Sequence, residues 1–209
     1  SRASGSSAAF LIGYVAKVVL LRLYSPADFG VFEVVIAITA TLLPIASLRY
    51  EDAMVLPEDD REARDLFVLS GALSAGFVLL VTVAALLLYR NPSLVERWIP
   101  AGTVAWVVAV PFVLAVLRLS KLFELWLIRR ERYPRLASGN VAQAGVMTIM
   151  RIVAGISQPG PAPLLGSFVA GHAAAATLYG VAAVGDLRKV PGRATWRRSR
   201  FSWGCSSAG

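Results

Sequence analysis

The chain has 209 residues, of which 56% are hydrophobic and only 16% are charged, and its formal net charge is +8. Soluble globular proteins carry about a quarter charged residues, so this composition leaves too little polar surface for a water-soluble fold. The excess of Lys and Arg would suggest nucleic-acid binding in a soluble protein. No DNA- or RNA-binding motif accompanies it, so no nucleic acid is expected as a partner.

Apolar segments along the chain predict an all-α polytopic membrane protein. The clearest segment runs from Leu66 to Tyr89 without one charged side chain. At about 1.5 Å per residue, it is long enough to cross the roughly 30 Å hydrocarbon layer of a bilayer. Six transmembrane helices are expected to form one bundle within residues 1–189. The predicted spans cover about residues 8–24, 29–48, 66–89, 98–128, 136–157 and 164–185.

Polar segments and turns separate these spans. Ser25 is a candidate N-cap for the second helix, and Pro44 is expected to kink that helix. A polar hairpin with charges of both signs follows over residues 49–65. A basic loop over residues 129–135 precedes the fifth span, and a Pro-rich turn over residues 158–163 precedes the sixth.

The distribution of Lys and Arg predicts the orientation of the bundle. Most of those outside the spans lie in the 49–65 hairpin, the 129–135 loop and the tail, all on one side of the predicted topology. By the positive-inside rule, both termini are therefore expected in the cytoplasm. The chain begins at Ser1 and is interpreted as a fragment. Residues 190–209 form a basic tail that is expected to be disordered or aberrant, with binding of anionic lipid as the alternative.

Four basic side chains inside the predicted spans are the candidate binding residues: Lys17, Arg118, Lys121 and Arg151. Placing an unpaired cation in the hydrocarbon costs roughly 3 kcal/mol on insertion scales. One deep carboxylate, Glu124, cannot neutralise all four. A water-filled cationic cavity between the helices would lower that cost and attract an anionic solute. The alternative is that the long side chains reach the headgroups at an interface.

Three ionisable residues are candidates for ion coupling: Glu33, Glu124 and His172. Glu33 lies near the start of the second span, where the helix dipole favours a carboxylate. His172 lies among small residues, where a hydrogen bond to a neighbouring helix is favoured over a proton relay.

The sequence contains no pattern typical of a metal site or of an enzyme. No Cys and His spacing fits a metal, and the carboxylates of the 49–65 hairpin lack the order of a calcium loop. No nucleophile motif, phosphate-binding loop or paired-carboxylate pattern occurs. No metal, cofactor or catalytic residue is therefore expected.

Several segments resemble a known family. Residues 23–32 and 44–57 resemble the start of bacterial polysaccharide-biosynthesis membrane proteins of the oligosaccharide flippase family. Residues 129–137 and 140–143 are similar to the link between the fourth and fifth spans of the same family. The resemblance covers about residues 8–189.

This resemblance implies the multidrug/oligosaccharidyl-lipid/polysaccharide exporter fold, in which twelve to fourteen helices form two related six-helix bundles. The chain would correspond to the amino-terminal bundle. The implied function is transport of undecaprenyl-diphosphate-linked oligosaccharide across the bacterial cytoplasmic (inner) membrane, for biosynthesis of lipopolysaccharide O-antigen or other polysaccharides. A polysaccharide polymerase or ligase would be a partner. Lys17 and Arg151 would hold the diphosphate, and Pro44 and Pro111 would be flex points.

Three alternatives stay open at this point. The chain could belong to another exporter of the same superfamily, for drugs or peptidoglycan precursors. It could be a membrane enzyme of envelope synthesis, although its predicted outer loops are short. It could also be a membrane partner that does not itself transport.

Overall fold

The computed structural model describes residues 20–46, 54, 59–91 and 104–188. Within these residues every regular element is helical, which confirms the all-α class for this part of the chain. The elements are α2 (Pro26–Leu42), α4 (Asp60–Arg90), the 3-10 helix η2 (Ala105–Val108), α6 (Ala109–Arg129), α7 (Tyr133–Ser157) and α8 (Pro161–Leu187).

The six predicted spans are confirmed only in part. Four helices of the described residues are long and apolar enough to cross a membrane: α4, the continuous η2–α6 segment, α7 and α8. The second predicted span corresponds to α2, which has 17 residues and stops short of the predicted end. The first predicted span lies outside the described residues except for its last few, and so does the predicted basic tail.

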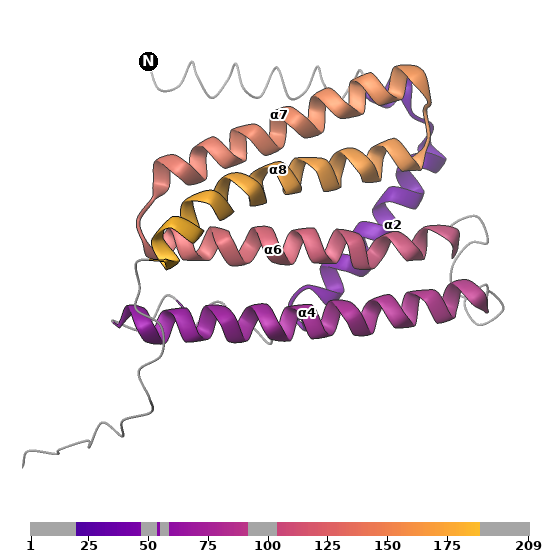
Figure 1. Cartoon of the computed structure of the whole chain (residues 1–209). Coiled ribbons are helices and arrows are strands. Elements are labelled where there is room, and N and C mark those ends of the chain that lie inside the picture. Colours follow the sequence, from indigo (N-terminus) through magenta and orange to yellow (C-terminus); the bar gives the residue numbers. More distant parts are fainter. Residues whose placement is uncertain (1–19, 47–53, 55–58, 92–103, 189–209) are drawn as a thin grey trace, which may run out of the picture.

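The four long helices lie roughly side by side, and α2 crosses them obliquely (Figure 1). Helix α6 packs between α4 and α8, and α8 packs extensively against α7. Successive long helices run in opposite directions (Figure 1). Short connections join α6 to α7 and α7 to α8. Helix α2 contacts both α6 and α8 and is therefore held by the centre of the bundle.

The ends of α2 follow from its local sequence. The Asp28 amide donates to the Ser25 hydroxyl (3.2 Å), and the Ser25 amide donates to the Asp28 carboxylate (2.9 Å), which forms a capping box. The predicted N-cap at Ser25 is confirmed. The predicted kink at Pro44 is wrong, because the helix ends at Leu42 and the chain turns. Proline has no amide hydrogen with which to continue the helical ladder.

Other helices begin inside segments that were predicted to be loops. Helix α4 starts at Asp60 with Asp59 as its N-cap, so the last part of the predicted polar hairpin is helical. Helices α7 and α8 start in the predicted basic loop and Pro-rich turn, because Pro134 and Pro161 fit the first turn of a helix. Pro111 is the third residue of α6 and lies just after the 3-10 helix η2.

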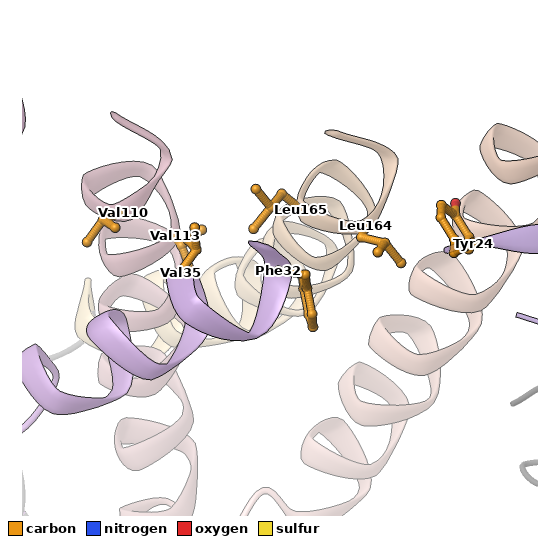
Figure 2. Close-up of a cluster of buried hydrophobic side chains, with 7 residues drawn as sticks. All are labelled: Tyr24, Phe32, Val35, Val110, Val113, Leu164 and Leu165. Atoms are coloured by element: carbon orange, nitrogen blue, oxygen red, sulfur yellow. The ribbon is translucent and has the colours of Figure 1, made fainter. Parts of the chain in front are cut away.

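A buried apolar cluster joins α2 to α6 and α8 (Figure 2). Val35 of α2 is 1% exposed and lies against Val110 and Val113 of α6, while Phe32 lies near the start of α8. The buried members of this cluster among the described residues are Tyr24, Phe32, Val35, Val110, Val113, Leu164 and Leu165.

Large apolar side chains cover the outer faces of α4 and α7. Leu79 and Leu80 on α4 are 66% and 63% exposed, and Val141 and Ile156 on α7 are 74% and 70% exposed. Such faces would be unfavourable in water, because exposing apolar surface to water costs about 25 cal/mol per Å². Together with the four long apolar helices, they indicate a membrane-embedded protein.

Ion pairs gather the polar segments at one end of the bundle. Asp60 at the start of α4 pairs with Arg129 (3.3 Å) and Arg130 (3.0 Å) at the end of α6. Arg132, in the turn before α7, pairs with Asp186 near the end of α8 (3.3 Å). The described part of the polar hairpin, the basic loop and the end of α8 therefore lie together.

Candidate functional site

Among the predicted site residues, Arg151 of α7 contacts both α2 and α8. It belongs to α7 and is partly buried. Its Nε donates to the Ser167 hydroxyl on α8 (3.2 Å), and its Cζ lies 5.2 Å from the centre of the Phe32 ring on α2. The Tyr24 hydroxyl, just before α2, donates to the Arg151 backbone carbonyl (2.7 Å). The guanidinium is therefore held between helices.

Local packing fixes each partner of Arg151. Tyr24 is 3% exposed and lies over Gly155, where an added Cβ would come within 2.9 Å of the tyrosine ring. The Ser167 hydroxyl donates to the Leu164 carbonyl (2.8 Å), so its oxygen is left to accept from Arg151. The Nη1 and Nη2 groups of Arg151 have no hydrogen-bond partner among the described residues.

Two of the candidate coupling residues lie near Arg151. Glu33 is exposed on α2 and follows Phe32, whose ring lies against the Arg151 guanidinium. His172 on α8 has its Nδ1 3.0 Å from the Phe168 carbonyl and its Nε2 3.1 Å from the Gln143 side-chain nitrogen on α7. The predicted hydrogen bond between His172 and a neighbouring helix is confirmed.

The hydrogen-bond pattern selects one tautomer of the His172 ring. A carbonyl can only accept, so Nδ1 carries the hydrogen, and the Nε2 of a neutral ring then accepts from the Gln143 amide. Protonation at Nε2 would turn this atom into a donor. The Gln143 amide would then have to turn over and present its oxygen, so a proton on His172 would rearrange the contact between α7 and α8.

Arg118 lies elsewhere, at the end of α2. It is 3% exposed, and its Nε and Nη2 both donate to the Ser74 hydroxyl on α4 (3.2 Å each). Its Nη1 lies 3.5 Å from the Leu43 carbonyl at the C-cap of α2. The helix dipole favours a cation there. Arg118 therefore links α2 to α4, beside a groove of about 450 Å³ between α4 and α6.

The remaining candidate residues are placed differently. Lys121 and Glu124 form an ion pair along α6 (3.4 Å), with their side chains 42% and 36% exposed. Lys17 lies outside the described residues. Phe32, which contacts Arg151, and Leu43, which contacts Arg118, are about 16 Å apart along the chain of α2. The structure thus places Glu33 and His172 in the region of Arg151, where Phe32 contacts the guanidinium and Phe168 contacts both Phe32 and His172. It places Arg118 and Lys121 at other positions.

Sequence reasoning missed the polar partners of these cations. Ser74, Ser167 and Gln143 lie inside predicted spans, and each forms a hydrogen bond between helices. The signal that could have identified them is their polarity, because a polar side chain at bilayer depth must find a partner within the protein.

The described residues contain no group of three or more His, Cys, Asp or Glu side chains that could hold a metal ion. Comparison of the chain with protein families, with curated proteins and with solved structures finds no match.

Proposed function

We propose that the chain forms the amino-terminal six-helix half of an exporter that moves undecaprenyl-diphosphate-linked oligosaccharide across the bacterial cytoplasmic membrane. The observation that supports this proposal is the placement of two arginines between membrane-crossing helices, both in contact with α2. Arg151 contacts Phe32 on α2, and Arg118 contacts the carbonyl of Leu43 at its end. Cations at these positions would attract and bind an anionic solute.

The cations lie at successive depths along the bundle. By the helical rise of about 1.5 Å per residue, Arg151 is roughly 9 Å from the end of α7 at Ser157. On α6, Arg118 and Lys121 are roughly 16 and 12 Å from the opposite end, at Arg129. A diphosphate crossing the membrane would meet these charges in turn, while its lipid tail stayed in the bilayer.

Two donor groups of Arg151 are suited to phosphate. Its Nε is engaged by Ser167, while Nη1 and Nη2 lack partners among the described residues. A guanidinium fork binds phosphate oxygens with two charge-assisted hydrogen bonds, which a lysine cannot reproduce. Helix α2 contacts both arginines, so a shift of α2 would alter the two positions together. Alternating access requires such coupled changes.

Flipping of a fluorescent undecaprenyl-diphosphate-linked sugar in proteoliposomes tests the proposal. We expect Arg151→Gln to lower the initial rate at least tenfold, with Arg151→Lys intermediate because it keeps the charge without the fork. Arg22→Gln is the matched control, since it removes one charge from an exposed residue just before α2; its rate should stay within twofold of wild type. A wild-type rate in Arg151→Gln contradicts the proposal.

The proposed orientation, with both termini in the cytoplasm, has its own test. Cys205 is the single cysteine of the chain and lies in the tail. A membrane-impermeant maleimide should label it only after the membrane is permeabilised. Labelling of Cys205 in intact cells would indicate that the C-terminus lies outside the cytoplasm and would contradict the proposed orientation.

A further inference from the structure

An open groove runs between α6 and α8, and we call it the α6–α8 groove. Its volume is about 640 Å³. Leu119 and Phe123 of α6 form one wall, and small residues of α8, including Gly180 and Gly185, form its floor. Arg188, directly after α8, lies at one end. The lining is otherwise almost wholly apolar.

The groove exists because α8 lacks large side chains along this line. A Cβ at Gly180 would come within 3.1 Å of the Phe123 ring, so the two helices approach closely at the floor. A Cβ at Gly185 would meet nothing within 4 Å, so the groove is open there. On the rim, Leu119 and Val181 are 48% and 75% exposed and would face the surrounding lipid.

The length of the groove matches one leaflet of a membrane. It extends from Ala173, near the middle of α8, to Arg188, just beyond its end. This is about 22 Å at the rise of an α-helix. Half of a bilayer, including its headgroups, is about 20–22 Å thick. The apolar part of the groove therefore lies at the depth of lipid chains, and Arg188 lies at the depth of headgroups.

The volume distinguishes between occupants. A helix about 10 Å wide would need roughly 1,700 Å³ over this length, well above the volume of the groove. An extended hydrocarbon chain, whose width is set by carbon contacts of about 4 Å, would need roughly 300 Å³. The groove can therefore hold two such chains, as in one diacyl lipid, and is too small to enclose a helix of a partner.

The charge at the end of the groove favours an anionic headgroup. Among the described residues, Arg188 has no carboxylate partner. The nearby carboxylate of Asp186 is engaged by Arg132 (3.3 Å) and so offers little repulsion to an anion. A basic side chain at the membrane surface attracts an anionic lipid, at about fivefold in affinity per residue.

We propose that the α6–α8 groove is a binding site for an anionic phospholipid of the leaflet in which α8 ends. The lipid phosphate lies at Arg188, and its two acyl chains run along the small residues of α8 toward the middle of the bilayer. This site requires only that the helices lie in a membrane, so it stands or falls independently of transport.

Native mass spectrometry of the purified full chain tests the site, with phosphatidylglycerol and phosphatidylcholine of identical acyl chains as probes. We expect wild type to bind phosphatidylglycerol about fivefold more tightly. Arg188→Gln should remove this preference and leave phosphatidylcholine binding unchanged. Gly185→Phe should weaken binding of both lipids by filling the groove, whereas Gly76→Phe, at an exposed glycine of α4 with nothing within 4 Å, should change neither.

Several results would overturn the proposal. They are equal binding of the two lipids by wild type, a preference that survives Arg188→Gln, and lipid binding that survives Gly185→Phe. If the protein forms a dimer and Gly185→Phe dissociates it, the groove is occupied by a second copy of the chain and not by a lipid. Arg188 is exposed and outside the helices, so its replacement tests the headgroup contact even if the glycine variant fails to fold.

Discussion

Replacing Gly139 with alanine should disrupt the contact between α7 and α8. Gly139 lies directly under the Tyr179 ring, and an added Cβ would overlap that ring. Tyr179 is 2% exposed and cannot move aside freely. Its hydroxyl donates to the Asn140 side chain (2.9 Å) and lies 3.4 Å from the Leu136 carbonyl. The alanine must therefore separate the helices or displace the tyrosine.

The expected loss of stability has two contributions, the steric overlap with the Tyr179 ring and the weakened hydrogen bonds of the Tyr179 hydroxyl. Overpacking a core costs about 1–3 kcal/mol, and each hydrogen bond between membrane helices contributes about 0.6 kcal/mol. Gly139→Ala should thus lower the free energy of unfolding by about 2–4 kcal/mol. Unfolding in mixed micelles of dodecylmaltoside and SDS, followed by circular dichroism, measures this change. The matched control is Gly145→Ala on the same helix, where a Cβ meets nothing within 4 Å.

The control should be neutral or stabilising by up to about 1 kcal/mol, because alanine is the better helix former. A double-mutant cycle with Tyr179→Ala isolates the steric term. Tyr179→Ala leaves a cavity, but Gly139→Ala should then add almost nothing. If Gly139→Ala matched Gly145→Ala to within about 0.5 kcal/mol, or if its effect persisted without the tyrosine ring, the steric argument would be refuted.

Two further predictions concern contacts at opposite ends of the bundle. Asp60→Asn should lower stability by about 1–2 kcal/mol at low salt, because it weakens the ion pairs with Arg129 and Arg130 together, and the loss should shrink as salt is raised. Tyr24→Phe should cost about 0.6–1.7 kcal/mol, since it removes only the hydroxyl that donates to the Arg151 carbonyl (2.7 Å). The same micelle unfolding measures both.

Each of these predictions has a distinct control. Asp186→Asn breaks one pair with Arg132, whose side chain is 54% exposed, and should change stability less than Asp60→Asn does. A salt-independent effect of Asp60→Asn would mean that the ion pairs are not its cause. An effect of Tyr24→Phe as large as that of Gly155→Ala, which crowds the whole ring, would contradict the hydrogen-bond account.

Local rules predicted much of the helical pattern. A charge-free segment such as 66–89 identifies a membrane-crossing helix by length and hydropathy alone, and α4 covers it completely. The N-cap at Ser25 was predictable because the cap and its partner Asp28 are three residues apart. The end of α2 was not predicted. Pro44 allows either a kink or a stop, and the stop is accompanied by a contact of Arg118 with Leu43 that no local rule foresees.

The candidate site shows the same division between local and distant information. The presence of Arg118 and Arg151 within long apolar helices could be predicted, because a charge in an apolar run is visible in the sequence. Their partners could not, since Ser74 is 44 residues from Arg118 and Tyr24 is 127 residues from Arg151. A small polar residue in a predicted span indicates that its side chain needs a hydrogen-bond partner, but the sequence does not identify which residue that partner is.

The sequence by itself determined that this is a helical chain with several membrane-length apolar segments carrying cations, because hydropathy and charge are properties of each segment alone. Only the tertiary structure decided that Arg118 lies at the end of α2, that Arg151 lies between Phe32 and Ser167, and that small residues of α8 leave a groove beside α6. These features depend on how helices rotate and approach one another. In lipid, the arrangement of the helices is determined by side-chain packing and by the need to pair polar groups, not by hydrophobicity.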